Sequence, residues 1–490
     1  MTRFSPRSTF AVADVRIRRL TFDQLSLFTM LWAGQGLIQL LTYEYFPRDA
    51  LFGLLLVATL AAIVLPNRTL ALATMLVLNL AYSWAHMPYQ VNHHLLEDCI
   101  NLILLGALAI AWMRRRRGRA DIGIRSATYE AFAGPARGAV VVMYVWSGIA
   151  KANTDFFDPM VGCATTLLGT ALHAEQNSAI VAWLATPVTA GTLVTEIGLG
   201  LLLAFRRTRF LAIPIGLLFH LSLAVVPIAA IQAFSYVAVA TYALFISPEV
   251  ATAASDLVGN SLRWLRRHLV ATVASGAVAV SVLVVAVTLA SRTIGNDEAF
   301  TYARVGLWFL GLVVLIVVYL RSLLAVVRRD GPRAIAVSDP LFTGSPVLWV
   351  VTLLVLVNGS LPYLGFKTQT SFTMFSNVWT EDGRTNHWFI SPAIQIGDYQ
   401  GDLVKIIETD DPELAEVADA GHSLTRFEFE RALSEKDDIS VECSCYGQIR
   451  RIEKVDGEFI GYEPRFSYTP FLGKVMSFRS VPDGKVACTQ

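Results

Sequence analysis

The stretch VVVMYVWSGIAKANTDFFDPMVG, residues 140–162, decides how the rest of the chain is interpreted. A nearly pure apolar helix runs into Lys151, and Asp155 follows four residues later. An ionisable side chain at membrane depth costs roughly 2.5–3.5 kcal/mol on insertion scales. The stretch therefore predicts a membrane-spanning helix that ends in a lysine with either an anchoring or a chemical role.

The composition indicates a polytopic membrane protein. Of 490 residues, 54% are hydrophobic and only 16% are charged, and the mean hydropathy is +0.51. Soluble globular chains carry about 25% charged residues. The net charge of +1, without a basic domain, argues against a nucleic-acid partner. The polar, arginine-rich start, MTRFSPRSTFAVADVRIRRL, does not predict a cleavable signal peptide.

Apolar runs of about 17–25 residues predict an all-α bundle of about eleven membrane spans. The second predicted span is short, and only the tripeptide PNR separates it from the third. These two segments could instead form a tight hairpin or a re-entrant unit. The predicted spans are 22–43, 50–65, 68–86, 92–113, 132–150, 188–205, 210–226, 229–247, 268–291, 305–327 and 346–364.

Clusters of basic residues give the predicted orientation. They precede the first span and follow the fourth, sixth, eighth and tenth, so all lie on one side if there are eleven spans. Because basic residues accumulate in cytoplasmic loops, we expect residues 1–20 inside the cell and the tail after residue 365 outside. The clusters are Arg16, Arg18 and Arg19, RRRRGR (114–119), RRTR (206–209), RWLRR (263–267), and Arg328, Arg329 and Arg333.

The tail, residues 365–490, differs in character and predicts a small, mainly β extracytoplasmic domain or a set of strands packed on the membrane core. Its segments alternate as strands do and are separated by Asp and Gly turns. The predicted strand segments are RFEFERAL (426–433), DISVECSCYGQIRRIEKV (438–455) and EFIGYEPRFSYTPF (458–471).

Three of the five cysteines, Cys443, Cys445 and Cys488, lie in this tail. The predicted outer compartment permits disulfides, and Cys488 could bridge to one of the other two. No histidine accompanies the C-x-C pair at ligand spacing, so no metal site is predicted. Cys99 and Cys163 are interpreted as ordinary cysteines in apolar surroundings.

The candidate catalytic residues are Lys151, Glu196 and His220. The predicted topology puts Lys151 at the outer end of the fifth span, Glu196 inside the sixth and His220 near the middle of the seventh. A lysine at a helix end commonly extends to the interface and serves only as an anchor. Buried ionisable groups usually face a cavity, a partner or a proton path, although a structural Glu196–His220 hydrogen bond would also satisfy both residues.

Further polar side chains gather near the predicted outer mouth and along the eighth span. Of these, Asp155, Tyr144, Tyr236 and His93 are the expected substrate pocket. His93 and His94 could instead cap the entrance to the fourth span, and His387 is interpreted as structural. The remaining candidates are His86, Glu97, Asp98, Asp158, His173, Glu175, Ser235 and Tyr242.

These residue types favour proton transfer. An amine beside an apolar wall is more readily neutral and therefore basic, an imidazole carries a proton near neutrality, and a carboxylate can orient it or take the proton onward. The chain has no phosphate-binding glycine loop, HExxH zinc pair or GxSxG nucleophile elbow. Proton transfer involving a membrane-soluble molecule is thus the main enzymatic possibility.

Two segments in this order carry a family resemblance. YVWSGIAKANTDFF (144–157), followed by FHLSLAVVPIAAIQAFSYVAVATYALFISPE (219–249), resembles the vitamin K-dependent γ-carboxylase group and the wider HTTM membrane-domain superfamily. The resemblance covers about residues 20–250. It divides the chain into a cytoplasmic segment (1–20), an HTTM or carboxylase-like membrane domain (21–250), additional membrane helices (251–364) and the extracytoplasmic tail (365–490).

The resemblance implies a quinol-dependent, carboxylase- or epoxidase-like lyase. Lys151 matches the lysine thought to deprotonate reduced vitamin K, and His220 matches the F-H-L histidine. The implied cofactor is reduced vitamin K or another quinol, without a metal, and the implied catalytic side faces outward. The chain departs from the animal enzymes at Ala150, where they have a second lysine, and at Phe156, where they have tryptophan.

The tail also departs from the animal enzymes, because it is much shorter than their luminal region. Its segment TQTSFTMFSNVWTEDGRTNHWFI (368–390) is similar to one that follows the last helix in bacterial HTTM proteins. The polar and aromatic character of this segment suits a position over the outer mouth.

Two hypotheses from different classes follow. The first is a multi-pass cell-membrane enzyme that uses a quinol, with Lys151 as the base and an unidentified substrate. The second is a non-catalytic module that binds lipid or quinone or assembles a membrane complex, with Lys151 and Glu196 as a structural pair. A transporter is a weaker alternative, because no repeated halves with broken helices are visible.

Overall fold

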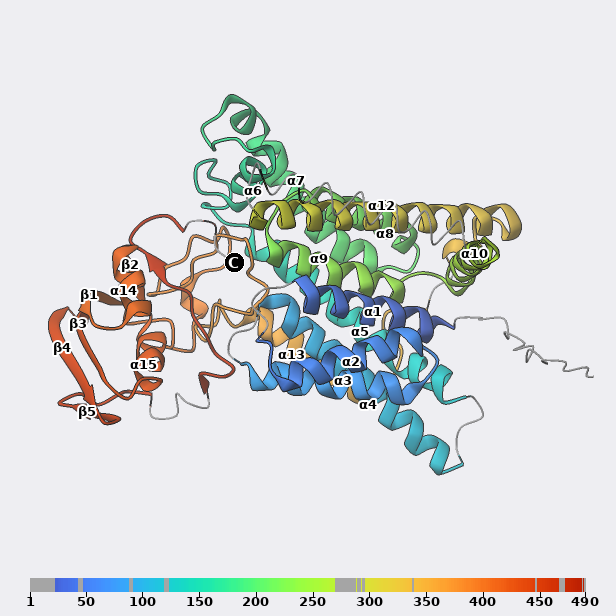
Figure 1. Cartoon of the computed structure of the whole chain (residues 1–490). Coiled ribbons are helices and arrows are strands. Elements are labelled where there is room, and N and C mark those ends of the chain that lie inside the picture. Colours follow the sequence, from blue (N-terminus) through green and yellow to red (C-terminus); the bar gives the residue numbers. More distant parts are fainter. Residues whose placement is uncertain are drawn as a thin grey trace, which may run out of the picture.

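The computed structural model consists of a helical bundle with a tail domain at one end (Figure 1). The structure describes residues 23–42, 47–87, 91–118, 123–268, 288, 292, 296–336, 339–445, 447–466, 472–486 and 488. The predicted cytoplasmic segment 1–20 and nearly all of the predicted span 268–291 lie outside these residues.

Each of the other predicted spans coincides with a helix. Those in the amino-terminal half are α1 (Gln24–Thr42), α2 (Ala50–Val64), α3 (Thr69–Ala85), α4 (Asn92–Arg116), α5 (Ile124–Ala150), α7 (Ala179–Ala204) and α8 (Arg209–Ala224). They are followed by α9 (Ala229–Thr241) with η1 (Tyr242–Leu244), α10 (Pro248–Arg267), α12 (Asn296–Asp330), η2 (Ala334–Ala336), η3 (Pro346–Leu348) and α13 (Trp349–Ser360). A short helix, α6 (Cys163–Leu172), lies between α5 and α7.

Four helices of the described part of the chain are long and apolar enough to cross a membrane: α1, α4, α7 and the segment Glu298–Asp330 of α12. A fifth candidate is broken, because Ala229–Leu244 and Pro248–Ser261 meet at an angle of 115°. At this break Ser247 caps α10 by accepting a hydrogen bond from the Val250 amide, and Pro248 occupies the first turn, where no amide hydrogen is needed. The apolar helices establish a membrane protein, and the number of eleven spans stays a prediction.

Helix α5 is the centre of the bundle and is buried on most sides. Small residues let its neighbours approach closely. A Cβ on Gly138 would lie 2.6 Å from the Trp349 ring of α13, and one on Gly134 would lie 2.1 Å from the Thr343 carbonyl oxygen. Lys151 caps the carboxyl end of α5. The small residues that set the packing of α5 therefore also set the position of Lys151.

The tail contains a six-stranded antiparallel sheet with the order β5-β4-β3-β1-β2-β6, which confirms the predicted sheet. Two helices, α14 (Pro412–Asp419) and α15 (Arg426–Ser434), accompany it. The strands are β1 (Val404–Thr409), β2 (His422–Leu424), β3 (Ile439–Cys445), β4 (Gln448–Val455), β5 (Glu458–Ile460) and β6 (Val481–Pro482). Of the third predicted strand segment, only β5 is a strand in the described residues.

The prediction that RFEFERAL forms a strand is wrong, because this segment is α15. Thr425 caps the helix by accepting a hydrogen bond from the Glu428 amide, and Arg426 pairs with Glu430 one turn away. Phe427 and Phe429 alternate like strand residues, but they are buried in two different clusters on two sides of the helix. The two buried phenylalanines therefore have the two-residue spacing of a strand, although both lie on one helix.

The cysteine pairing also differs from the prediction. Cys443 bonds to Cys445 within β3, whereas Cys488 bonds to Cys163, 325 residues earlier in the chain. Cys163 is therefore not an ordinary apolar cysteine. Val486 and Cys488 lie against the bundle, and this return of the chain, which local sequence does not encode, decides the pairing.

Candidate functional site

A cavity of about 510 Å³ lies among α5, α6, α7, α8, α9 and the tail. Most of its wall is apolar. Its charged lining residues are Lys151 and Glu196, and the lining hydroxyls belong to Ser147, Thr192 and Ser222. Volumes of roughly 300–1,000 Å³ are typical of small-molecule sites, so the cavity is large enough for a ring with an attached chain.

Lys151 and Glu196 form an ion pair in the cavity wall. Lys151 Nζ lies 2.9 Å from Glu196 Oε2, and the side chains are only 5% and 7% exposed. The amine also donates to the carbonyl oxygens of Ser147 and Met374, each at 3.4 Å. Because Lys151 caps α5, its positive charge lies at the negative end of the helix dipole.

Glycines bring the two helices of this ion pair together. A Cβ on Gly148 would lie 2.4 Å from Ile197 Cγ1, and one on Gly200 would lie 2.9 Å from Val145 Cγ2. Neither position has room for a larger residue, so α5 and α7 pack closely. This close packing allows a lysine and a glutamate on different helices to reach each other.

His220 lies behind the cavity wall and is not one of its lining residues. Its Nε2 is 2.9 Å from the Tyr144 hydroxyl, and its Nδ1 is 3.0 Å from the Ser235 hydroxyl. Tyr144 is also 2.7 Å from the Tyr242 hydroxyl, which fits against α8 because residue 216 is glycine. These hydroxyls, and not Glu196, occupy both ring nitrogens of the histidine.

Tyr144 and Lys151 nevertheless share one face of α5, since they are seven residues apart and Ser147 lies between them. The His220 side is separated from the cavity by its neighbours Phe219 and Phe234, which do line the cavity. The structure therefore joins Lys151 with Glu196, and places His220 in an adjoining hydroxyl cluster.

The other residues expected in the pocket lie outside the cavity wall. Asp155 accepts a hydrogen bond from the Val486 amide at 3.0 Å. Tyr236 packs edge-on against Trp308 of α12, and the His93 ring packs against that of His94 at the start of α4.

The remaining candidates are dispersed around the bundle. Asp158 pairs with Lys485, and the hydrogen bond from this lysine lowers the pKa of the aspartate. His173 contacts the Tyr302 hydroxyl, Glu175 is exposed, and His86 pairs with Asp49. Glu97 accepts hydrogen bonds from Gln35, Gln39 and Asn79, and Asp98 accepts one from Ser83. In the described part of the chain, no three His, Cys, Asp or Glu side chains form a cluster that could hold a metal.

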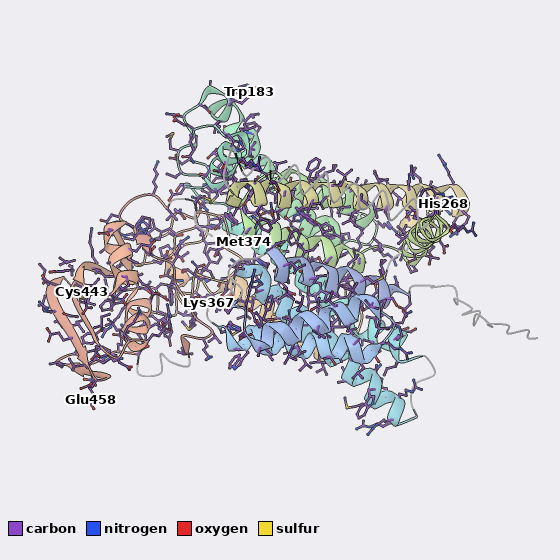
Figure 2. The ribbon with its side chains drawn as sticks, in the orientation of Figure 1. Trp183, His268, Lys367, Met374, Cys443 and Glu458 are labelled. Carbon is purple, nitrogen blue, oxygen red and sulfur yellow. A yellow bond between two sulfur atoms is a disulfide. The ribbon has the colours of Figure 1, made fainter. Side chains whose placement is uncertain are left out.

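The tail covers the cavity with Met374 and Phe375, which are part of its wall. Figure 2 shows Met374 and Lys367 where the tail meets the bundle, while Cys443 and Glu458 lie at the far end of the tail. The lining by Met374 and Phe375 puts segment 368–390 against the cavity. The polar and aromatic character of this segment predicted a position over the outer mouth, but it did not predict the individual contacts.

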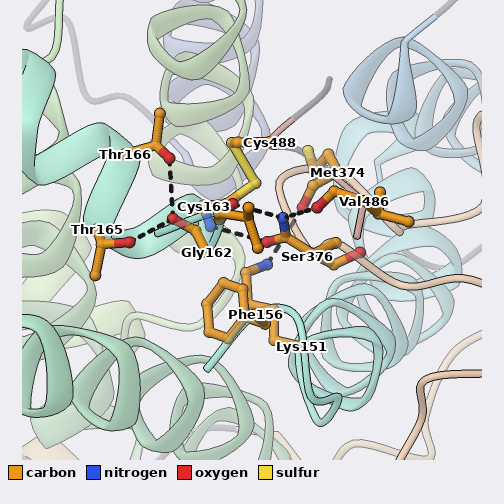
Figure 3. The surroundings of a disulfide bond; sticks show 12 residues. Lys151, Phe156, Gly162, Cys163, Thr165, Thr166, Met374, Ser376, Val486 and Cys488 are labelled. Carbon is orange, nitrogen blue, oxygen red and sulfur yellow. Dashed lines mark hydrogen bonds between the residues drawn. A yellow bond between two sulfur atoms is a disulfide. The ribbon is translucent and has the colours of Figure 1, made fainter. Parts of the chain in front are cut away.

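Hydrogen bonds hold this cover on the loop that follows α5. Asn153 Nδ2 donates to the Ala150 and Ser376 carbonyl oxygens, at 2.8 and 2.6 Å. Asn377 donates to Val161 and Val486 and accepts from the Cys163 amide. Figure 3 shows Lys151 and Phe156 beside the Cys163–Cys488 disulfide, with Met374 and Ser376 of the tail next to them.

The cavity reaches the molecular surface between α6 and α8. Leu172, Ser222 and Val225 line it and are exposed. The outward faces of the adjacent helices carry exposed apolar side chains such as Leu218 and Val194. The opening therefore lies on an apolar flank of the bundle, next to the surface that the lipids would cover.

These features define an integral membrane protein whose helical bundle encloses an apolar cavity with one buried ion pair. The family model of the HTTM domain matches residues 73–249, a range that contains Lys151, Glu196 and His220. The match confirms the predicted HTTM resemblance, and the domain bounds 21–250 stay a prediction. No curated protein and no solved structure matches the chain.

Proposed function

We propose that the protein is a multi-pass cell-membrane enzyme that binds reduced vitamin K or another quinol in the 510 Å³ cavity and uses Lys151 as the base. The observation that carries this proposal is the Lys151–Glu196 ion pair in a mostly apolar wall. A quinol matches both parts of the cavity, because its polar ring suits the ion pair and its apolar substituent suits the apolar wall.

Proton transfer within the pair would prepare the base. When the proton of Lys151 Nζ moves to Glu196 Oε2 across 2.9 Å, a neutral amine and a neutral carboxyl group result. The amine can then accept a proton from a bound hydroxyl, which restores the ammonium beside the developing negative charge. A bound quinol would supply the acidic hydroxyl and two reducing equivalents, and dissolved dioxygen would be the oxidant that accepts them.

The surrounding residues support this role. Phe156, Met374 and Phe375 line the cavity and restrict water at its polar end. The carbonyl oxygens of Ser147 and Met374 direct the amine. The His220–Tyr144–Tyr242 cluster supports the same face of α5 two turns before Lys151.

We further propose that the amino terminus is cytoplasmic and that the tail and the cavity cover are extracytoplasmic. The basic clusters support this orientation. The two disulfides support it independently, because both involve residues on the predicted outer side and disulfides persist in oxidising compartments.

A specific observation also favours the second candidate function, a non-catalytic lipid- or quinone-binding module or scaffold. Lys151 connects α5, α7 and the tail through Glu196 and the Met374 carbonyl oxygen. Such a connection would stabilise the cover without any chemistry.

The Lys151→Arg variant separates the two candidates. Arginine retains the positive charge for Glu196 but remains protonated and cannot act as a base. With the protein in lipid nanodiscs and dissolved dioxygen as the oxidant, oxidation of a short-chain naphthoquinol should fall by about 10²–10⁴-fold, the usual contribution of a general base. Quinone binding and thermal stability should remain near those of the wild type.

Lys367→Arg is the matched control, because Lys367 is also a buried lysine but does not line the cavity. It should leave the oxidation rate unchanged. Equal oxidation rates for wild type and Lys151→Arg would exclude Lys151 as the base and favour the binding or scaffold function.

A further inference from the structure

Ser147 differs from the other hydroxyl residues of the cavity wall. Thr192 donates its hydroxyl hydrogen to the Val188 carbonyl oxygen at 2.8 Å, and Ser222 donates to that of Phe219 at 2.7 Å. The Ser147 hydroxyl is buried and has no hydrogen-bond partner among the described residues. Ser147 is therefore the lining hydroxyl that its own helix leaves unsatisfied.

Its position is at the polar end of the cavity. Ser147 precedes Lys151 by one helical turn, and its carbonyl oxygen accepts a hydrogen bond from Lys151 Nζ. The nearby Tyr144 hydroxyl is already engaged by His220 and Tyr242. A ligand group beside the ion pair would thus meet Ser147 Oγ as the available neutral hydrogen-bonding group.

A serine inside a helix usually bonds to a carbonyl three or four residues back, as Ser222 does here. A buried hydroxyl without a partner is unfavourable and needs an explanation. Because Ser147 lines a cavity, the cavity contents can supply the missing partner.

We propose that Ser147 Oγ is a specificity-determining group that donates a hydrogen bond to an oxygen on the ring of the cavity ligand. The ligand class is then an oxygen-substituted ring with an apolar chain, as opposed to a plain hydrocarbon or an acyl chain. This inference rests on the proposed quinol site but concerns recognition, so it does not depend on Lys151 acting as a base.

The test compares two probes on the full chain in nanodiscs. One is a naphthoquinone with a short prenyl chain, and the other is the prenylnaphthalene that lacks both ring oxygens. One hydrogen bond changes the affinity by roughly three- to tenfold. Ser147→Ala should weaken quinone binding by that factor and leave binding of the oxygen-free probe unchanged. Ser147→Cys, with a thiol that donates weakly, should behave in the same direction.

Ser222→Ala and Thr192→Val are the matched controls, since both hydroxyls line the same cavity but bond to their own helices. Both should keep the wild-type preference for the quinone. Thermal melts without ligand add an independent readout, because removal of an unsatisfied hydroxyl should not lower the midpoint.

The possible failures are distinguishable. If the wild type binds neither probe, the proposed quinol site is wrong and the inference falls with it. If the wild type prefers the quinone and both Ser147 variants retain that preference, only the role of Ser147 is wrong. An equal loss of preference in the Ser222 and Thr192 variants would also overturn the specific role of Ser147.

Discussion

Lys151 Nζ and Glu196 Oε2 lie 2.9 Å apart across the interface of α5 and α7, and both side chains are buried. Neither partner has ready access to water, so each depends on the other for compensation of its charge. The same ion pair can stabilise the packing of the two helices. It can also hold a proton that moves from the amine to the carboxylate. The two proposed functions differ in which of these roles the protein uses.

The dependence of the two charges on each other predicts a double-mutant effect. Lys151→Met should destabilise the protein by about 3–5 kcal/mol, because Glu196 becomes an unpaired buried charge. Adding Glu196→Leu should recover most of that loss. Denaturation in detergent, followed by near-UV circular dichroism, measures both values. A double variant as unstable as Lys151→Met would show that the ion pair is not the source of the effect.

The close approach of α5 and α7 predicts a steric effect at Gly148. Gly148→Ala puts a methyl group 2.4 Å from Ile197 Cγ1, and such overpacking costs roughly 1–3 kcal/mol. Gly198→Ala on α7 is the control, since nothing lies within 4 Å of a Cβ there. The control should be neutral or slightly stabilising. The measurement is the thermal unfolding midpoint of each variant. Equal changes of the midpoint in both variants would refute the steric explanation.

The Cys163–Cys488 disulfide predicts a stability that depends on the redox state. Loss of a native disulfide typically costs roughly 2–5 kcal/mol, and a long loop gives the larger entropic effect. The Cys163→Ser/Cys488→Ser variant should therefore unfold at lower denaturant concentration. Hydrogen exchange should increase at Asn377, whose side chain holds both the Cys163 amide and the Val486 carbonyl oxygen. Unchanged exchange at this residue would mean that hydrogen bonds alone hold the cover.

Lys367 predicts a pH dependence of the tail. Burial lowers the pKa of Lys367 to about 8, from an ordinary value of 10.5. The unfolded state therefore binds more protons than the folded state between these values, and stability should rise as the pH increases from about 8 to 10.5. The rise is at most about 3.5 kcal/mol at roughly 1.4 kcal/mol per pKa unit.

Lys367→Met should remove this rise, which denaturant midpoints at pH 7.5 and 10 would measure. Lys485→Met is the control, because the exposed Lys485 pairs with Asp158, which raises the pKa of the lysine. The control should retain the wild-type slope in this range. A wild-type slope in Lys367→Met would assign the titration to another group.

The sequence predicted much of the helical architecture, because apolar runs in a membrane protein are long and continuous. It also predicted the sheet around β3 and β4, where strand alternation is regular. It failed at α15, since Phe427 and Phe429 are buried on two sides of one helix. The spacing of apolar residues along the chain indicates which residues are buried. It does not indicate which neighbouring element covers them.

For the site, the sequence by itself selected Lys151 and Glu196, because ionisable residues are expensive in apolar helices. Only the tertiary structure decided that they form an ion pair, that His220 lies behind Phe219 and Phe234, and that Ser147 has an unused hydroxyl. It also decided that Cys488 returns to Cys163. Composition and spacing depend on neighbours along the chain, whereas these contacts join segments far apart in sequence and exist only when the helices and the tail have packed together.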